Sequence, residues 1–195
     1  MKFKIDKVNV YGIEETTTYS GLPMSIDDTT LTPDLERLAK LGNTQIGAGH
    51  DCALKGIVVQ ANITAPQYWW PQFQRYHFAD IVSSQSKMHK LTKMNLEEQC
   101  NEYVTTYAKK LAEKVIDQYT KDPSKRNFQV MMSNVPMGLV LTARITTNYL
   151  QLKNIYSQRR LHKLEEWQQF CKWCLTLPNF KKLIGIEEVK VCNKN

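Results

Sequence analysis

Aromatic and basic side chains are concentrated between Trp69 and Phe78, and a segment rich in hydroxyl groups follows at residues 83–89. Phosphate groups are bound by charged donors, and a planar ring system is bound by stacking against aromatic faces. The two segments therefore provide the side chains that a phosphorylated ring compound requires. The alternative interpretation is an amphipathic helix that buries its tryptophans beside a polar loop. The candidate polar side chains are Gln72, Arg75, His77, Ser84, Ser86 and Lys87.

A second candidate face lies on a helix that we expect from Pro136 to about Arg160. Asn148 and Arg159 are eleven residues apart, so in a helix they share nearly one direction, roughly 16 Å apart along the axis. An arginine on a partly buried face is costly unless it binds a partner. The alternative is that Arg159 extends past the helix end to solvent. A polar stripe beside these two residues consists of Gln151, Asn154 and Gln158.

The first region has the residue order of a known family signature. Ala65-Pro66 leads into Gln74-Arg75-Tyr76-His77, and Ser86 follows a few residues later. This order is similar to that of the flavin-dependent thymidylate synthases. In that family an Arg-His-Arg at a helix end follows an Ala-Pro and precedes a serine with an arginine two residues beyond. His50 stands where the family has a flavin-contacting histidine.

The C-terminal half resembles the same family. Val135-Pro136 is followed by the run from Thr147 to Leu152, then by Asn154 and Arg159. The family has a Leu-Pro, a Thr-x-Asn-Ala-Arg-Ser-Leu, a later asparagine and an arginine in this order. Leu164-Glu165-Glu166-Trp167 is similar to the Ala-Gln-Trp-Glu of the family. The resemblance covers residues 45 to 175 approximately, and the order agrees across two distant segments.

The chain departs from the family at several nucleotide-binding positions. Only the first member of Arg-His-Arg is kept, because the run reads Arg75-Tyr76-His77. The motif hydroxyl falls at Ser84 or Ser86, and the arginine beyond it becomes Lys87 or Met88. Two other basic positions of the family are occupied here by Met132 and Leu150. The flavin-binding residues therefore match the family better than the residues for the nucleotide phosphate.

The resemblance implies a homotetramer that binds FAD and reductively methylates deoxyuridine monophosphate. The carbon would come from methylenetetrahydrofolate and the hydride from NADPH through the flavin. The family assigns FAD binding to His50, Arg75, His77, Asn148 and Asn154. It assigns substrate binding to Gln72, Arg75, Ser84, Ser86, Lys87 and Arg159, with Arg159 as the catalytic residue that polarises the pyrimidine. The alternatives are an enzyme of this fold that acts on another pyrimidine nucleotide, and a basic nucleic-acid-binding module without catalysis.

Composition and charge limit the classes of protein that the chain can represent. Its 195 residues are 42% hydrophobic and 23% charged, which excludes bulk disorder and a disulfide scaffold. The net charge is +7, and residues 121–195 carry 13 basic against 5 acidic side chains. Such a basic segment is typical of proteins with phosphate-bearing partners, although a solvated basic surface gives the same count. Nucleic acid is the less favoured partner because no recognised nucleic-acid motif is present.

Cysteine usage and apolar patterning predict a cytoplasmic protein with no membrane association. The cysteine count, five, is odd, as expected for reduced thiols, and no apolar run approaches the ~20 residues of a membrane span. We expect no metal site, because His50, His77 and His89, with Cys52 or Cys100, match no ligand spacing. Cys171-x-x-Cys174 lies in a predicted helix and is interpreted as two buried thiols.

The helices and strands that we expect from the sequence indicate an α+β fold, and they must position these residues. The patterns favour one mostly helical domain over residues 1–195, with a small antiparallel or mixed sheet. Strands are predicted at 3–11 and 54–63, and residues 80–89 are predicted as a loop. Helices are predicted from a Thr32 cap to Gly42, at 66–78, from Asn95 to Asp122, at 136–160 and at 162–175.

Overall fold

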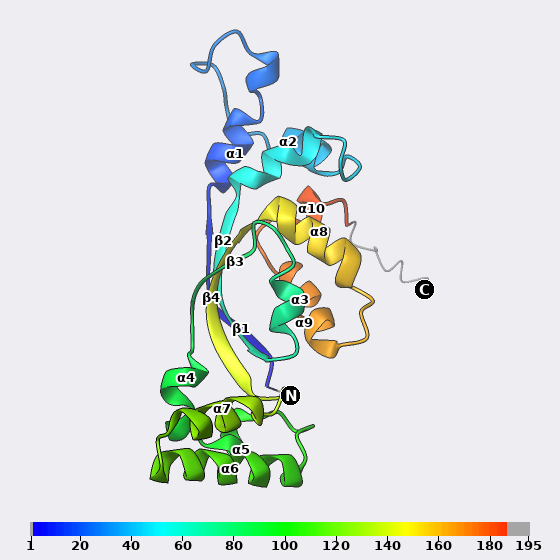
Figure 1. Cartoon of the computed structure of the whole chain (residues 1–195). Coiled ribbons are helices and arrows are strands. Elements are labelled where there is room, and N and C mark those ends of the chain that lie inside the picture. The colour runs from blue at the N-terminus through cyan, green and yellow to red at the C-terminus, as the bar shows by residue number, and fades with distance from the viewer. Residues whose placement is uncertain (1, 187–195) are drawn as a thin grey trace, which may run out of the picture. The chain divides into compact units, whose positions relative to one another are not determined.

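A four-stranded antiparallel sheet runs in the order β1-β2-β4-β3 in the computed structural model, which describes residues 2–186 (Figure 1). Backbone hydrogen bonds fix the register of β2 and β4: Gln67 N donates to Leu139 O (2.9 Å) and Tyr149 N donates to Ile57 O (3.0 Å). The paired residue numbers rise along one strand as they fall along the other, so these two strands are antiparallel. The strands are β1 (Lys4–Tyr11), β2 (Val58–Pro66), β3 (Asp80–Ser84) and β4 (Val140–Asn148).

Helices outnumber strands in the described part of the chain, which confirms the α+β fold predicted from the sequence. None of the helices within residues 2–186 combines the length and the apolar character that a membrane span requires. The α-helices are α1 (Ile13–Tyr19), α2 (Leu35–Gly42), α3 (Trp70–Phe73), α4 (Lys87–Lys90), α5 (Leu96–Gln99), α6 (Thr106–Lys121), α7 (Lys125–Ser133), α8 (Tyr149–Arg159), α9 (Glu165–Cys174) and α10 (Phe180–Leu183). The 3₁₀ helices within residues 2–186 are η1 (Leu22–Met24), η2 (His50–Gly56) and η3 (Leu91–Lys93).

The chain divides into two compact units, each made of two segments. Unit 1 contains Met1–Lys7 and Ala61–Ile145, and unit 2 contains Val8–Gln60 and Thr146–Asn195. Strands β1, β2 and β4 each contribute residues to both units. The expected single domain over residues 1–195 stays a prediction.

Unit 1 has an apolar cluster among its helices and an aromatic cluster around α3. Helices α6 and α7 lie side by side (Figure 1), and Met131 of α7 is fully buried. Around α3, the Trp69 ring stacks on Phe73 at 5.1 Å, and Phe3 packs against Trp69 at 5.5 Å. The helical cluster consists of Leu91, Leu96, Cys100, Ala112, Met131 and Leu139.

Unit 2 is built around α8, which packs against η2 and α9. Tyr149, at the start of α8, is fully buried, and its hydroxyl donates to Pro178 O at 2.7 Å. The Phe180 ring of α10 meets the Tyr149 ring edge-on at 5.0 Å. Burial of large side chains such as Tyr149 and Phe180 stabilises the unit.

The predicted helix over 136–160 is wrong in its first half, which forms strand β4. Burial alternates along Ala143, Arg144, Ile145 and the following residues, as in a strand with one buried face. The run Ile145-Thr146-Thr147 is β-branched and favours a strand over a helix. Helix α8 begins only after Asn148, whose side chain accepts a hydrogen bond from Gln151 N at 2.9 Å.

The region between β2 and β4 also differs from its prediction. Pro66 ends strand β2, so the helix predicted over 66–78, with Pro71 inside it as a kink or a late start, begins late and is only the single turn α3. The predicted loop at 80–89 contains β3 and α4. The helix predicted from Asn95 is interrupted, because Cys100 forms a bridge with Leu139 between α5 and α6.

Several other predictions are confirmed with small shifts in their bounds. The strand at 3–11 is β1, the last predicted helix is α9, and α2 ends at Gly42 as expected. The strand predicted at 54–63 begins later because η2 occupies its first residues. Helix α2 is capped by Asp34 rather than Thr32, since the Asp34 carboxylate accepts a hydrogen bond from Arg37 N at 2.8 Å.

Candidate functional site

A pocket of about 260 Å³ in unit 1 contains two of the predicted substrate-binding residues, Ser84 and Lys87. The ends of β2, β3 and β4, together with α3 and α4, supply its walls. Lys87 is the only charged side chain among its lining residues, so this pocket favours an anionic or polar ligand. The other lining residues are Gln67, Trp70, Pro71, Gln74, Ile81, Gln85, Leu141, Thr142 and Ala143.

Lys87 is held in this pocket by a glutamine that the sequence analysis did not single out. Its ammonium group donates to Gln67 Oε1. The amide group of Gln67 in turn donates to Pro136 O at 3.0 Å, and Gln67 N donates to Leu139 O at 2.9 Å. Because Gln67 is fixed by the backbone before β4, it fixes the position of the Lys87 charge. A single glutamine after Pro66 carries no signal in the sequence that distinguishes it from a surface residue.

The remaining polar walls of the pocket come from the β3–β4 pairing. Gln85 N donates to Thr142 O, and Thr142 N donates to Gln85 Oε1, both at 2.9 Å. The side chain of Gln85 thus continues the hydrogen-bonded ladder past the end of β3. Thr142 also shares a hydrogen bond of 2.8 Å with the hydroxyl of Thr64 on β2. This side of the pocket is therefore a rigid backbone surface.

Trp70 forms the aromatic wall of the pocket. Its indole nitrogen donates to Ala65 O at 3.2 Å. Its ring is nearly perpendicular to Trp69 at 5.1 Å and to Phe73 at 5.7 Å. A tryptophan held by a hydrogen bond and two edge-on contacts provides a preorganised face for a planar ring.

The other predicted residues of unit 1 do not line this pocket. Gln72 is half-buried in α3, and Arg75 and His77 follow α3 with exposed side chains. Phe78 follows with a left-handed φ of 58° and an exposed ring, an uncommon conformation for an aromatic residue. Ser86 occupies the position that precedes α4. Arg75, His77 and Phe78 thus form an exposed segment with positive charge and an aromatic ring.

In unit 2, three predicted residues lie on or beside α8. Asn148 uses its side-chain oxygen to cap the helix. The Asn154 side-chain oxygen is buried and has no hydrogen-bond partner within residues 2–186. The Thr147 hydroxyl, at the end of β4, is buried in the same way. His50, the fourth predicted residue of the unit, is exposed at the start of η2.

Arg159 lies at the end of α8 and packs on an aromatic ring. Its guanidinium carbon is 4.8 Å from the centre of the Trp167 ring, and Trp167 is fully buried. The His162 ring lies 6.3 Å from the same ring. Burial, and then the Arg159 charge, lower the pKa of His162. The predicted face shared by Asn148 and Arg159 is corrected here, because Asn148 precedes the helix and acts as its cap.

A buried ion pair in unit 2 went unnoticed in the sequence. Lys153 Nζ is 2.8 Å from Asp51 Oδ2, and their side chains are only 9% and 4% exposed. The same ammonium group donates to Gly42 O and Thr44 O, both at 2.8 Å. Lys153 thus ties α8 to η2 and to the end of α2. The pair could not be predicted from the sequence, because Asp51 and Lys153 are 102 residues apart along the chain.

The cysteines of the described region are free thiols, and two of them occupy α9. Cys171 and Cys174 are buried there, as predicted. Burial raises the pKa of Cys171 to about 12 and raises the pKa of Cys174 well above its usual value. Within residues 2–186, no cluster of three or more histidine, cysteine or acidic side chains could hold a metal ion.

Solved structures of one bacterial enzyme share this fold. A crystal structure of thymidylate synthase X from Helicobacter pylori with FAD and dUMP has a TM-score of 0.68 and 14% sequence identity, over 94% of this chain and 96% of that chain. A second structure, of flavin-dependent thymidylate synthase from Helicobacter pylori complexed with FAD and dUMP, has a TM-score of 0.66 and the same identity, over 94% and 97% of the two chains. No protein-family model and no curated protein matches the sequence. The likeness confirms the fold that the sequence resemblance implied.

Proposed function

We propose that this chain is a divergent flavin-dependent thymidylate synthase. It would methylate deoxyuridine monophosphate reductively, with carbon from methylenetetrahydrofolate and hydride from NADPH. One observation carries the proposal: the family whose motif order the sequence resembles also has this fold, although the identity to the similar structures is only 14%. Motif order and backbone topology are separate properties of a chain, so their agreement supports a common function more than either does alone.

The pocket of unit 1 supports binding of a pyrimidine nucleotide. Lys87 offers a positioned positive charge, Ser84 a hydroxyl group and Trp70 an aromatic face. Lys87 and Ser84 suit a phosphate group, and Trp70 suits a planar base. We assign the phosphate to Ser84 and Lys87 in the pocket and to Ser86 beside it at the start of α4. We assign further substrate contacts to Gln72 and Arg75, which lie outside the pocket.

The buried oxygen of Asn154 supports binding of FAD. A buried acceptor without a donor costs free energy, and a ligand that donates to it recovers that cost. FAD carries amide, amine and hydroxyl donors that fit such an acceptor. The residues proposed to bind FAD are Arg75 and His77 in unit 1, and His50, Asn148 and Asn154 in unit 2. FAD, when bound, supplies the hydride transfer, and the chain supplies orientation and charge.

Arg159 is the proposed catalytic residue. Its charge would stabilise the negative charge that develops on the pyrimidine ring. Packing on Trp167 restricts the guanidinium group, and restriction of this kind is what preorganised stabilisation requires. We further propose a homotetramer in the cytoplasm, and the free thiols of the described region are consistent with a reducing compartment.

A second candidate function is the same chemistry on another pyrimidine nucleotide. It is favoured by two positions where the family has basic residues. Met132 packs against the helical cluster of unit 1 and offers no charge, and Lys87 replaces a bidentate arginine by a point charge. A different phosphate or sugar pattern would then be recognised.

The absorbance spectrum of the purified protein tests the flavin part of the proposal. We expect the visible band of an oxidised flavin, either on purification or after addition of FAD. Protein that stays colourless after FAD is added and unbound FAD is removed would overturn the proposal.

Calorimetric titration with dUMP tests the nucleotide part. Lys87→Ala should weaken binding roughly ten- to a hundredfold, because one charge-assisted hydrogen bond is lost. Lys90→Ala is the matched control, since Lys90 lies on the same short helix with an exposed side chain but does not line the pocket. Flavin-loaded protein that binds another pyrimidine nucleotide but not dUMP would favour the second candidate.

A further inference from the structure

The segment between α1 and α2 in unit 2, residues 21–31, carries apolar side chains in solvent. We call it the arm. In Figure 1 it loops away from α1 and α2. The Met24 side chain is 92% exposed, Ile26 is fully exposed and Leu22 is half-exposed. A cluster of exposed apolar side chains on one short segment is typical of an interaction surface.

The base of the arm is fixed by one arginine. Arg37 of α2 donates from Nε to Ser20 Oγ at 3.0 Å. Its Nη2 donates to Thr17 O at 2.9 Å and, on the other side of the arm, to Thr32 O at 3.3 Å. Because Arg37 holds both ends of the arm, the arm projects from a defined position.

The tip of the arm is held by its own hydrogen bonds. Asp27 Oδ1 accepts from Thr29 N at 3.0 Å and from Thr29 Oγ1 at 2.6 Å. These hydrogen bonds lower the pKa of Asp27, so its carboxylate is charged at neutral pH. Asp28 follows it. The arm therefore presents apolar side chains next to two adjacent carboxylates.

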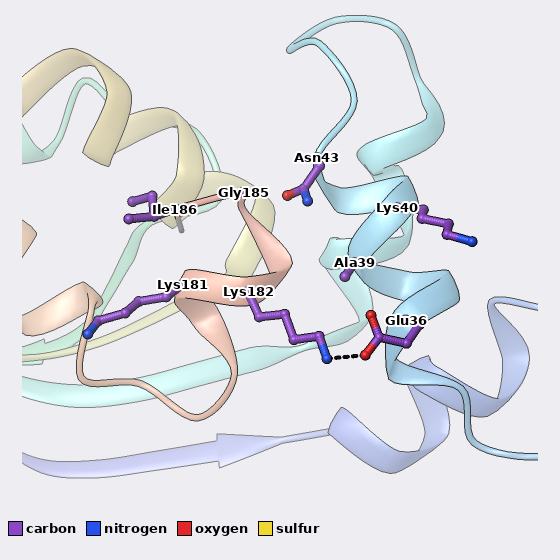
Figure 2. A pocket seen from close by; sticks show the side chains of 8 residues that line it. All are labelled: Glu36, Ala39, Lys40, Asn43, Lys181, Lys182, Gly185 and Ile186. Atoms are coloured by element: carbon purple, nitrogen blue, oxygen red, sulfur yellow. Dashed lines mark hydrogen bonds and ion pairs between the residues drawn. The ribbon is translucent and has the colours of Figure 1, made fainter. Parts of the chain in front are cut away.

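A pocket of about 390 Å³ lies between α2 and α10 in the same unit (Figure 2). Its apolar members are Ala39 and Ile186. Figure 2 shows Lys182 reaching from α10 to Glu36 on α2, while Lys40 points outward from α2. The Glu36–Lys182 pair is exposed, so opening it costs little free energy.

The chemistry of this pocket favours a peptide segment over a free anion. Both α2 and α10 end beside it, at Gly42 and Leu183, and helix C-termini carry partial negative charge. An isolated phosphate would therefore find lysines but no backbone N–H groups of a helix start. A segment with apolar side chains can instead occupy the apolar part while its carboxylates lie near the lysines. The basic members are Lys40, Lys181 and Lys182.

We infer that the arm of one copy of this chain docks in the α2–α10 pocket of a second copy. Met24 and Ile26 cover the apolar members of the pocket, and Asp28 lies near Lys40. The partner is a second copy because one chain provides both complementary surfaces, acidic and apolar on the arm, basic and apolar in the pocket. Reciprocal docking closes a two-fold dimer in which each copy gives one arm and one pocket. The inference rests on the proposed function in one respect, because it names the surfaces of one interface within the proposed homotetramer.

Sedimentation equilibrium of the full chain tests the role of the arm. The double variant Met24→Asp, Ile26→Asp should raise the dissociation constant of self-association by about tenfold or more, because its central apolar contacts are lost. Tyr107→Asp is the matched control, since Tyr107 is also an exposed large side chain but lies on α6 of unit 1. Circular dichroism verifies that each variant is folded. A monomeric wild-type chain at micromolar concentration, or arm variants that associate like wild type, would overturn the inference.

A charge exchange tests the pocket as the receptor. Asp28→Lys and Lys40→Glu should each weaken association by about threefold, because each places like charges together. The double variant restores opposite charges and should return towards the wild-type constant. Additive weakening in the double variant would show that the arm docks elsewhere. Wild-type chains that self-associate while the arm and pocket variants associate equally well would overturn this inference alone. A monomeric wild-type chain would also contradict the proposed homotetramer, and flavin absorbance tests the rest of the proposed function separately.

Discussion

Arg159 combines a structural contact with a proposed catalytic role, and the two can be separated by measurement. Arg159→Ala removes the contact with Trp167, which should lower the free energy of unfolding by about 0.5–2 kcal/mol. It should also lower turnover roughly a hundredfold or more with FAD content retained, because charge stabilisation on the pyrimidine is lost. Steady-state rates per bound flavin and urea unfolding give the two values.

Two further substitutions serve as controls for Arg159. Arg160→Ala should change the rate little, because the Arg160 side chain is exposed and donates to Ser157 O near its own helix end. Arg159→Lys keeps a cation above Trp167 but loses the planar guanidinium fork, so it should recover stability without recovering turnover. A normal rate per flavin in Arg159→Ala would exclude this residue from catalysis.

The buried Lys153–Asp51 pair should be sensitive to the loss of one partner. Asp51→Leu leaves the ammonium group buried without its counter-charge, and we expect a loss of about 3–5 kcal/mol in the free energy of unfolding. The double variant Asp51→Leu, Lys153→Met should be more stable than this single variant. Asp117→Ala, which removes the exposed pair with Lys121, should cost less than about 1 kcal/mol. Urea titration measures all three, and equal losses for the buried and exposed pairs would contradict the expectation.

The two buried thiols of α9 predict a loss of stability at alkaline pH. Between the ordinary thiol value near 9.0 and the pKa of about 12 for Cys171, the unfolded chain has lost the thiol proton while the folded chain retains it. The folded state then binds more protons, so the free energy of unfolding falls as pH rises, by about 1.4 kcal/mol per pH unit for each thiol. Below this window neither state ionises, and the contribution is fully present.

Urea unfolding from about pH 8 to about pH 11 measures this slope. Cys171→Ala and Cys174→Ala should each make it shallower, because one titrating group is removed. Cys52→Ala is the control and should leave the slope unchanged, since Cys52 is exposed and lies outside α9. A slope that is the same in all three variants would show that α9 does not cause it.

At the scale of elements, Asn148 joins strand β4 to helix α8. Its side-chain oxygen caps the helix, and it is also a proposed FAD contact. Asn148→Ala should cost about 1 kcal/mol in stability, because the cap is lost. Asn148→Ser keeps a capping oxygen but removes the amide group, so stability should be retained while FAD content falls. Flavin absorbance per chain and thermal unfolding measure the two effects. Full FAD content in Asn148→Ser would show that Asn148 caps the helix but does not contact FAD.

The sequence predicts elements well where the pattern and the local chemistry agree. Alternation over residues 3–11 gives β1, and the apolar spacing before Pro178 gives α9. Strand β4 was missed because Leu141, Ile145 and Leu152 satisfy a helical period, and only the β-branched run before Asn148 indicated a strand. Tertiary pairing with β2 decides the outcome there, and no local pattern contains that information.

In the candidate site, too, residues in local motifs could be predicted from the sequence, whereas residues whose roles depend on strand pairing could not. Ser84 and Lys87 were predicted from the motif order, and the structure places both in one pocket. Gln67 and Thr142 were missed because their roles come from the β2–β4 register rather than from their neighbours in sequence. The amide and hydroxyl groups that line a pocket between strands become recognisable only when the strand pairing is known.

At the scale of the whole molecule, some of the cationic side chains are engaged in contacts within the chain. Lys153 is buried against Asp51, Arg159 packs on Trp167, and Arg144 donates to Lys7 O at 2.6 Å. Single-stranded DNA should therefore bind weakly, and its binding should disappear between about 50 mM and about 200 mM salt, because released counterions dominate such binding. Fluorescence anisotropy of a labelled oligonucleotide measures this. Tight binding that persists at the higher salt concentration would favour the nucleic-acid alternative.

The four tryptophans are divided equally between the two units. Trp69 and Trp70 belong to unit 1, and Trp167 and Trp173 belong to unit 2. Replacing one pair by phenylalanine leaves an emission spectrum that reports on the other unit alone. The chain therefore contains two pairs of intrinsic fluorophores, with which the unfolding of each unit can be recorded separately and without any attached dye.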